Sequence, residues 1–197
     1  MPILYYLRHG ETDWNVEQRL QGHRDTVLNA RGRMQAVYCG ELLRGLFARD
    51  ERQPQDCCYV SSPLARARET MELVRVALDL DQRGYELDDR LLEISFGAWE
   101  GLTLPEIEAS APNAIIERER DKWDFTPPGG ESYRDLTARV GDWYASVTAD
   151  TVVAAHGGVA RALIAYFHIL PHEEATHAEI AHGVVYVFAG GTMARYA

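Results

Sequence analysis

The sequence predicts an α/β fold with a mainly parallel central sheet flanked by helices on both faces. Short apolar runs alternate along the chain with segments of helical periodicity, which is the pattern expected of strand–helix–strand units. Three of these apolar runs end in arginine, histidine, serine or glycine rather than in a simple turn. Hydrophobic residues make up 46% of the 197 residues and charged residues 25%, so the chain can bury a substantial core.

The first half of the chain contributes two strands and two helices. Residues 2–7 are aliphatic and aromatic, as in a buried strand. Residues 29–47 have helical spacing, with Asn29 placed as the N-cap. A second strand is predicted at 56–62, followed by a helix at 63–78 with a proline in its first turn, where an N–H group is not needed.

The second half repeats this alternation. Residues 131–147 form an amphipathic helix that begins with a capping-box pattern at Ser132. Residues 151–158 predict a strand that ends in His-Gly-Gly, and residues 159–169 predict the helix after it. Residues 183–197 predict two closing strands around a Gly-Gly turn.

Residues 96–130 interrupt the alternation. This segment contains Pro105 and Pro112 and ends in a Thr-Pro-Pro-Gly-Gly loop, which indicates a small lid-like insertion beside the sheet. We therefore expect one domain spanning residues 1–197, with the insertion at about 96–130 covering the site.

Composition and charge exclude several classes of function. The formal net charge of −10 opposes a nucleic-acid partner, because such a partner needs a basic stripe. No apolar run reaches the roughly 20 residues that span a bilayer, and the N-terminus lacks a signal-peptide pattern, so we expect a cytoplasmic protein with no membrane partner. The three cysteines have neither disulfide-framework nor metal-site spacing. We expect no cofactor, and a homodimer is one candidate for the oligomeric state.

Polar residues follow three of the predicted strands, at the edge where open α/β sheets bind their ligands. They are Arg8, His9 and Gly10 after the first strand, Ser61 and Ser62 at the end of the second, and His156, Gly157 and Gly158 after the third. If these strands are parallel neighbours, two histidines and an arginine meet at one rim. Arg66, in the first turn of the following helix, would point toward the same rim.

This set of side chains favours a phosphate site over a metal site. Histidines that bind a metal are normally joined by carboxylates or thiolates, and an arginine beside a divalent cation is electrostatically unfavourable. Arg8 and Arg66 can each donate two hydrogen bonds to a phosphate. Gly10 and Gly157 leave room for the anion and let the backbone approach it closely, and the helix that begins near Gly158 adds N–H groups at its positive end. We expect a small phosphorylated substrate and no metal ion.

A histidine of this rim can act as a nucleophile. Metal-free hydrolysis of a phosphate ester needs a group that attacks phosphorus and an acid that protonates the leaving oxygen, and a neutral imidazole can be the attacking group. The ordinary pKa of histidine is about 6.5, and two nearby arginines discourage a further positive charge. One histidine can therefore stay neutral at neutral pH.

Four stretches have the form of family signatures: LRHGETDWN at 7–15, SSPLARARET at 61–70, LLEISFGAWEG at 91–101 and AHGG at 155–158. In content, order and spacing they resemble the histidine phosphatase superfamily, the phosphoglycerate-mutase-like proteins. The matches extend over residues 7–158, which is most of the chain. The family fold, an α/β sheet with helices on both sides, agrees with the fold that the sequence pattern predicts.

The resemblance implies a role for each residue of the rim in a metal-independent phosphatase. His9 would become phosphorylated, and Glu93 would donate a proton to the leaving oxygen and later help to activate water. The phosphate pocket would be formed by Arg8, Arg66 and His156, with Asn15 at its edge. A carboxyl group donates a proton only if its pKa is raised toward the working pH, and we expect Phe96 and Trp99 to provide an apolar wall for Glu93.

Within the superfamily, the sequence favours a small phosphatase over a phosphoglycerate mutase. The basic residues of the insertion alternate with acidic ones at 117–122, so no positive cluster for a second anionic group is evident. The stretch DFTPPGGES at 124–132 resembles the small phosphatase branch. Gln21 and Gly22 stand where mutases tend to have a hydroxyl residue near the substrate, and we include both among the substrate-binding residues.

Two alternatives stay open. Mutase activity is the first. The second is a non-catalytic phosphate-binding protein with the same fold, although such a protein would be expected to lose His9 or Glu93. A further departure from many relatives is His182, where they have an asparagine before the closing strands; the sequence leaves its role open.

Overall fold

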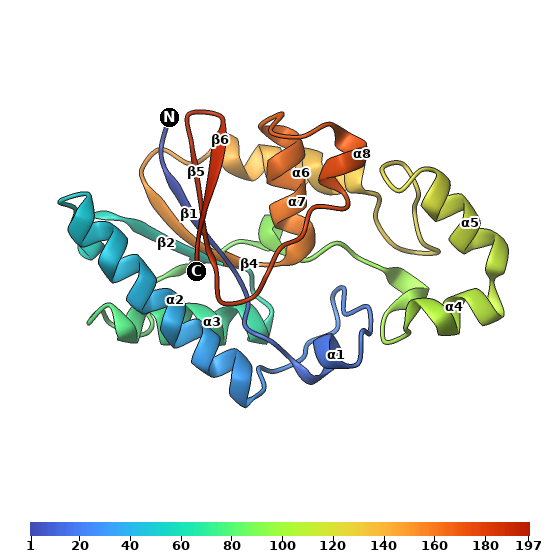
Figure 1. Ribbon diagram of the computed structural model, residues 1–197, viewed down its shortest axis with the longest axis horizontal. Helices are drawn as coiled ribbons and strands as arrows, with labels where there is room; N and C mark the ends of the chain where they lie inside the picture. The colour runs from blue at the N-terminus through green and yellow to red at the C-terminus, as the bar shows by residue number, and fades with distance from the viewer.

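A six-stranded sheet with the order β3-β2-β4-β1-β5-β6 forms the centre of the computed structural model, which describes residues 1–197 (Figure 1). The strands are β1 Leu4–Arg8, β2 Cys58–Ser61, β3 Glu86–Leu87, β4 Thr151–Ala155, β5 Val185–Ala189 and β6 Thr192–Tyr196. Neighbours among β3, β2, β4 and β1 run parallel, whereas β5 is antiparallel to β1 and to β6. The mainly parallel sheet predicted from the sequence is confirmed.

The register of the parallel strands places their carboxyl ends side by side. Arg8 of β1 is opposite Ala155 of β4, and Ser61 of β2 is opposite Ala154. The residues that follow β1, β2 and β4 therefore leave the sheet side by side, at the same edge. This confirms the expectation that the three polar strand ends meet at a single rim.

Helices cover both faces of the sheet (Figure 1). One face of β1, with Tyr5 and Leu7, packs into the core formed with α2 (Ala30–Arg49) and α3 (Ala65–Ala77). The other face, with Leu4 and Tyr6, packs into the core formed with α6 (Tyr133–Ala145) and α7 (Gly157–Tyr166). Because both faces of β1 are buried, its sequence is continuously apolar rather than alternating.

The helix termini agree with the predicted caps, with two corrections. Asn29 accepts a hydrogen bond from the N–H of Gly32 at 2.8 Å, as an N-cap does. α3 begins at Ala65 with Leu64 as its N-cap, so Pro63 precedes the helix rather than lying in its first turn. Ser132 caps α6 by accepting from the N–H of Asp135 at 3.1 Å, but the Asp135 carboxylate accepts from the Ser132 hydroxyl instead of closing a capping box on the backbone.

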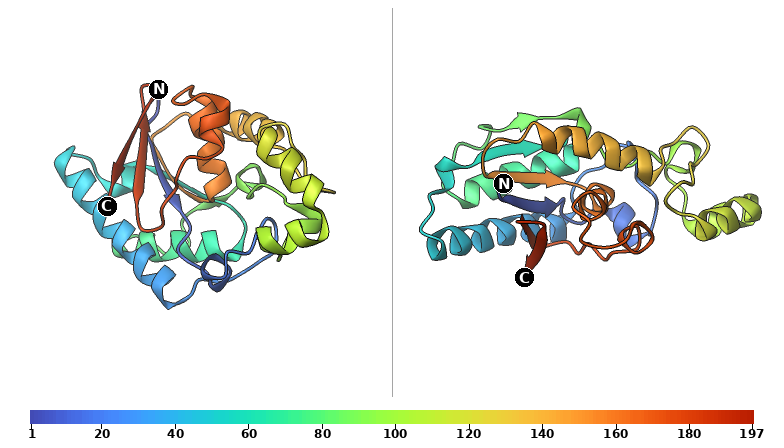
Figure 2. Two further views of the ribbon diagram at one scale, coloured as in Figure 1. Left: turned by 45° about the vertical axis from the view of Figure 1, so that its right-hand side comes forward. Right: turned by 90° about the horizontal axis from the view of Figure 1, so that it is seen from above.

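The remaining elements are the closing turn, the insertion and several short helices. The predicted Gly-Gly turn joins β5 to β6, and Gly190 and Gly191 have φ values of 56° and 78°, which favour glycine. Residues 96–130 contain the 3-10 helix η3 (Gly97–Trp99), α4 (Leu104–Ser110) and α5 (Pro112–Arg120). Figure 2 shows α4 and α5 standing away from the sheet and its covering helices. The other short helices are α1 Asp13–Val16, α8 His172–Ala175, η1 Pro54–Asp56 and η2 Asp89–Leu91. None of the helices combines the length and apolar character that crossing a membrane requires.

Candidate active site

His9 lies directly after β1, and its hydrogen bonds define which ring nitrogen is free. Its backbone N–H donates to the carbonyl of Ala155 at 2.8 Å, which extends the β1–β4 ladder by one residue. Its Nδ1 lies 2.8 Å from the carbonyl oxygen of Gly10. A carbonyl oxygen only accepts, so Nδ1 carries the proton and Nε2 keeps a lone pair. Nε2 makes no hydrogen bond within the chain, as a nucleophile requires.

The surroundings of His9 keep its ring neutral. The residue is 2% exposed. Burial, followed by electrostatic interactions with Arg66, His156 and Arg8, holds the pKa of His9 well below its ordinary value. The imidazole is therefore uncharged at neutral pH, with its lone pair available for attack.

His156 follows β4 and faces His9, with their ring centroids 5.2 Å apart. Its Nε2 lies 2.7 Å from the hydroxyl of Ser62, which also accepts from the N–H of Leu64 at 3.4 Å. When the hydroxyl hydrogen is donated to Nε2, the ring proton lies on Nδ1, which has no partner in the chain. Burial, then the charges of Arg66 and Arg8, hold the pKa of His156 well below its ordinary value. In this tautomer, His156 is a neutral ring whose Nδ1 can donate to a ligand.

The two predicted arginines are buried and fixed by backbone carbonyls. Arg66 is fully buried, and its terminal nitrogens donate to the carbonyls of Arg24 and Gly22, both at 2.8 Å. Arg8 donates through Nη1 to the carbonyl of Ile180 at 2.6 Å. Neither forms an ion pair, so their charges remain available to an anion. Burial lowers the pKa of Arg66 to about 10 and also lowers that of Arg8, yet both stay protonated at neutral pH.

Three buried nitrogens of this site have no partner in the chain. Six buried side-chain polar atoms of the protein lack a hydrogen bond, and three of them are Arg8 Nε, Arg66 Nε and His156 Nδ1. Buried polar groups without partners are rare and costly, and all three belong to residues that lie near His9 and act on it electrostatically. An anion with several oxygen acceptors, such as a phosphate, would satisfy all three at once.

Thr70 links the backbone of Gly10, next to His9, to the backbone of Arg66. Its hydroxyl accepts from the N–H of Gly10 at 3.0 Å and donates to the carbonyl of Arg66 at 2.7 Å. Gly10 itself packs against α2, because a Cβ there would clash with the carbonyl of Gly32. The expectation that Gly10 leaves room for the anion is therefore replaced by a packing reason. Gly157 does face the cations, since a Cβ there would lie 3.6 Å from both Arg8 Nε and Arg161 Nη1.

Glu93 reaches the same rim from the loop after η2. Its Oε1 accepts from the N–H of Gly158 at 3.0 Å and of Ile94 at 2.9 Å. The loop is held by Arg139, whose Nη1 donates to the carbonyls of Arg90 and Leu92 at 2.8 and 3.0 Å. The carboxylate therefore lies at the N-terminus of α7, next to His156.

The expected apolar wall of Phe96 and Trp99 beside Glu93 stays a prediction. Trp99 stacks on Phe125 with centroids 5.2 Å apart, and Phe96 packs against the core between the sheet and α6–α7. The groups bonded to the carboxylate are backbone N–H groups, as above.

The other predicted binding residues surround the site with roles in its framework. The side-chain oxygen of Asn15 accepts from the N–H and hydroxyl of Thr12, both at 3.0 Å, in the capping box of α1, while its amide N–H groups bond to nothing in the chain. Gln21 is buried and accepts from the Thr26 hydroxyl at 2.6 Å. Gly22 has a φ of 51° and supplies a carbonyl to Arg66. Direct contact of these residues with a substrate stays a prediction.

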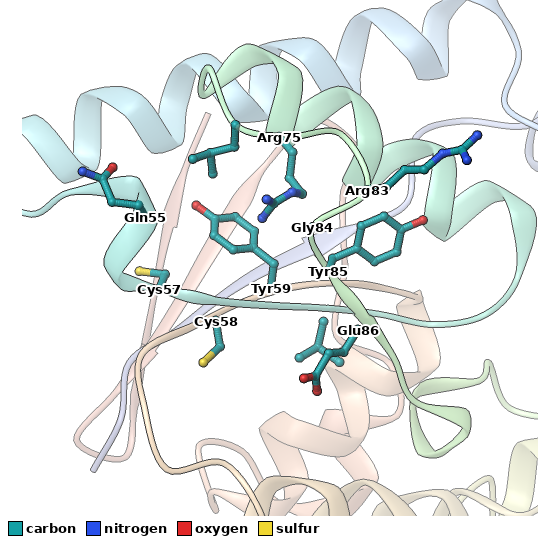
Figure 3. A pocket seen from close by; sticks show the side chains of 11 residues that line it. Gln55, Cys57, Cys58, Tyr59, Arg75, Arg83, Gly84, Tyr85 and Glu86 are labelled. Atoms are coloured by element: carbon teal, nitrogen blue, oxygen red, sulfur yellow. The ribbon is translucent and has the colours of Figure 1, made fainter.

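A hollow of about 510 Å³ lies elsewhere, at the β2–β3 edge of the sheet (Figure 3). Arg75 covers the ring of Tyr59 at 4.4 Å and donates to the carbonyl of Asp81 at 2.6 Å. Cys57 and Cys58 line the same hollow. None of the predicted site residues lines this hollow, so it is separate from the rim formed by those residues.

Comparison with known proteins identifies the family. The model of the histidine phosphatase superfamily (branch 1) matches residues 4–192. The chain belongs to this superfamily. It is 39% identical to the glucosyl-3-phosphoglycerate phosphatase of Mycobacterium tuberculosis over 185 residues, which cover 85% of this chain and 76% of that protein. It is 30% identical to the 2,3-bisphosphoglycerate-dependent phosphoglycerate mutase 2 of Gloeobacter violaceus over 206 residues, covering 99% and 90% of the two chains.

Solved structures of this histidine phosphatase family agree with the fold. The mycobacterial glucosyl-3-phosphoglycerate phosphatase in complex with VO3 superimposes with a TM-score of 0.79 at 33% identity, covering 100% of this chain and 96% of that one. The α-ribazole phosphatase of Shigella flexneri gives a TM-score of 0.77 at 25% identity, covering 97% and 93%. The resemblance deduced from the four sequence stretches is confirmed, and with it the enzyme class.

Sequence reasoning missed several residues that shape this histidine phosphatase site. Thr70, Arg139 and Arg161 all lie against predicted site residues or the backbone that carries them. Thr70 could have been predicted, because it lies four residues after Arg66 and thus on the same side of a helix. Arg139 comes from a distant segment and had no sequence signal. Ser62 had been placed at the rim, and His182 had been singled out without a role; they bond to His156 and to the backbone of His9.

Proposed function

We propose that this histidine phosphatase is a phosphomonoesterase that hydrolyses a small phosphorylated metabolite through a phosphohistidine formed on His9, with Glu93 as the proton donor. The single observation that carries the proposal is the state of His9. Its Nδ1 is committed to a carbonyl, and its Nε2 is free beside three unpartnered buried donors. The named activities of the relatives, a glucosyl-3-phosphoglycerate phosphatase among them, support a phosphate ester of small size.

The first step transfers the phosphoryl group to the enzyme. Nε2 of His9 attacks phosphorus, the bond between phosphorus and the ester oxygen breaks, and Glu93 donates a proton to the departing alkoxide. Arg8, Arg66 and His156 Nδ1 donate hydrogen bonds to the phosphate oxygens, whose charge they stabilise in the transition state. The hydrogen bond from Nδ1 to Gly10 stabilises the positive charge that develops on the ring.

The second step returns the enzyme to its initial state. A water molecule attacks phosphorus, the bond from phosphorus to Nε2 breaks, and Glu93 takes a proton from that water. The carboxyl group is therefore acid in one step and base in the other, as microscopic reversibility requires.

Release of phosphate from para-nitrophenyl phosphate in the presence of a chelator tests the proposal. We expect activity in the wild type and none in His9→Ala, with an acid-labile, base-stable phosphoryl group trapped only when His9 is present. Arg66→Gln should reduce kcat/KM at least a hundredfold, whereas Arg68→Gln, an exposed arginine on the same helix, is the matched control. Activity in His9→Ala, or dependence on an added metal, would refute the mechanism.

The role of Glu93 is tested by comparing two substrates whose leaving groups differ in their need for a proton. In Glu93→Gln, hydrolysis of an alkyl phosphate should fall at least a hundredfold, because its alkoxide needs a proton. Hydrolysis of para-nitrophenyl phosphate should fall much less, because nitrophenolate leaves without one. Equal losses on both esters, or full kcat with an unchanged pH–rate profile, would exclude Glu93 as the acid.

Mutase activity is the second candidate function, because relatives of 30% identity are phosphoglycerate mutases. Isomerisation of 3-phosphoglycerate, with and without 2,3-bisphosphoglycerate, separates the two. We expect phosphate release to exceed isomerisation under both conditions.

A further inference from the structure

His23 lies in a tight turn beside the rim. The N–H of Arg24 donates to the carbonyl of Gln21 at 3.0 Å, so residues 21–24 form a hydrogen-bonded turn with Gly22 and His23 at its centre. The side chain of His23 is exposed, yet it acts electrostatically on the buried His156. The mechanism described above gives this histidine no role.

The turn is bonded to both Arg66 and Glu93. The carbonyls on either side of His23, those of Gly22 and Arg24, each accept from a terminal nitrogen of Arg66 at 2.8 Å. The ring of His23 reaches the other partner, since its Nε2 lies 2.9 Å from the carbonyl oxygen of Glu93. A carbonyl oxygen only accepts, so Nε2 carries a proton and donates it.

Glu100 makes a second link between the turn and the loop that carries Glu93. Its Oε1 accepts from the backbone N–H of His23 at 2.9 Å and from that of Phe96 at 3.3 Å. A Cβ on Gly22 would clash with this carboxylate, so the turn packs directly against it. These contacts fix the backbone of His23 relative to the loop and make its ring a well-placed donor.

The carbonyl of Glu93 has one other donor nearby. Nη2 of Arg139 lies 3.5 Å from it, which is at the long limit of a hydrogen bond. Arg139 belongs to α6 and donates to the carbonyls of Arg90 and Leu92, so it holds the earlier part of the loop. His23 makes the shorter bond to Glu93, and it ties that residue to the turn that holds Arg66.

We infer that His23 is a positioning residue that fixes the separation between Arg66 and the carboxyl group of Glu93. Arg66 binds the phosphoryl group and Glu93 protonates the oxygen that leaves it, so their separation must match a single ester linkage. A general acid that is displaced from the leaving oxygen loses much of its effect. His23 acts through Glu93 and does not touch the substrate. The inference rests on the proposed phosphatase function, in which Glu93 is the acid.

Two variants separate the hydrogen bond of His23 from its ring. His23→Phe keeps an aromatic ring and loses the donor, whereas His23→Gln keeps a donor N–H at a similar distance along the side chain and loses the ring. The substrates are para-nitrophenyl phosphate and para-nitrobenzyl phosphate, which are similar in size; only the benzyl ester releases an alkoxide that needs a proton. In His23→Phe, we expect kcat/KM to fall about tenfold or more for the benzyl ester and less than about threefold for the phenyl ester. His23→Gln should keep the wild-type preference between the esters, as should His177→Phe, the same substitution at an exposed histidine outside the site.

A double-mutant cycle shows whether His23 acts through Glu93. In the Glu93→Gln background no carboxyl group is left to position, so adding His23→Phe should lower kcat/KM for the benzyl ester by less than about twofold. Because the ring of His23 is exposed, all variants should keep the wild-type melting temperature.

Three outcomes would overturn the inference while leaving the proposed function intact. They are an unchanged ester preference in His23→Phe when Glu93→Gln is selective, losses from the two substitutions that multiply in the double mutant, and a loss on both esters that follows a lowered melting temperature. Equal losses on both esters in Glu93→Gln, or no hydrolysis by the wild type, would instead overturn the proposed function and this inference together.

Discussion

Nδ1 of His182 lies 2.7 Å from the carbonyl oxygen of His9. The carbonyl can only accept, so His182 donates and its Nε2 is unprotonated. The two ring centroids are 5.6 Å apart. The backbone of the nucleophile is thus fixed on one side by Ala155 and on the other by a side chain from the loop before β5.

Replacing His182 tests whether this bond positions His9. In His182→Ala, we expect kcat to fall about tenfold with little change in KM, because the phosphate donors stay in place while the ring of His9 shifts. His182→Asn retains a donor N–H at a similar distance along the side chain and should recover most of kcat. A burst experiment on phosphohistidine formation measures the affected step. Equal defects in both variants, or a defect confined to KM, would contradict the positioning role.

Lowering the pH should destabilise the folded protein over a pH range set by the lowered pKa values of its buried histidines. Burial, followed by the charge of Arg8, lowers the pKa of His182 to about 4, although its bond to His9 opposes the shift. Between about pH 6.5 and 4 the unfolded chain binds a proton that the folded chain rejects, so the free energy of unfolding falls as pH falls, by up to about 1.4 kcal/mol per pH unit for this group. The lowered pKa values of His9 and His156 act in the same direction.

Urea unfolding at several pH values measures this dependence. In His182→Asn the loss of stability between pH 6.5 and 4 should be smaller than in the wild type. Identical pH dependence in the two proteins would show that His182 titrates normally in the folded state.

Thr70→Val should damage both stability and activity. The substitution keeps the volume but removes the acceptor of the Gly10 N–H and the donor to the Arg66 carbonyl, leaving a buried N–H unpaired at a cost of about 1–3 kcal/mol. We expect kcat/KM to fall at least tenfold. The matched control is Thr137→Val, whose hydroxyl is buried without a partner, so that its loss should be neutral or stabilising. Thermal denaturation and steady-state kinetics of both variants check the contrast.

Gly158→Ala should displace Glu93. A Cβ at this position would clash with Oε1 of Glu93 and lie 3.1 Å from a methyl carbon of Ile94. We expect hydrolysis of alkyl phosphates to fall at least a hundredfold. Gly45→Ala, on α2 with no atom within 4 Å of the new Cβ, should instead stabilise the protein by about 0.5–1 kcal/mol. Wild-type kinetics in Gly158→Ala would show that Glu93 is not held as described.

The predicted elements with strong local signals are close to the observed ones. The helix capped by Asn29 and the strands at 4–8 and 151–155 follow from periodicity and capping, because those signals depend on neighbouring residues alone. The pair Arg8-His9 and the residue His156 are recognisable for the same reason, as polar residues directly after apolar strands. Arg66 was placed at the rim by its position in the first turn of the helix that follows the second strand. Glu93 needed the family resemblance, since alone it resembles an ordinary surface charge.

The sequence by itself determined the fold class, the family and the candidate residues of the phosphate site. Tertiary structure alone decided the tautomer of His9 and the burial of Arg66 among backbone carbonyls. Charge alternation along a helix describes only local neighbours, whereas the electrostatic environment of a side chain depends on every segment packed around it. For that reason the protonation and the hydrogen-bond partners of the rim residues became visible only when the strand ends and α7 were placed together.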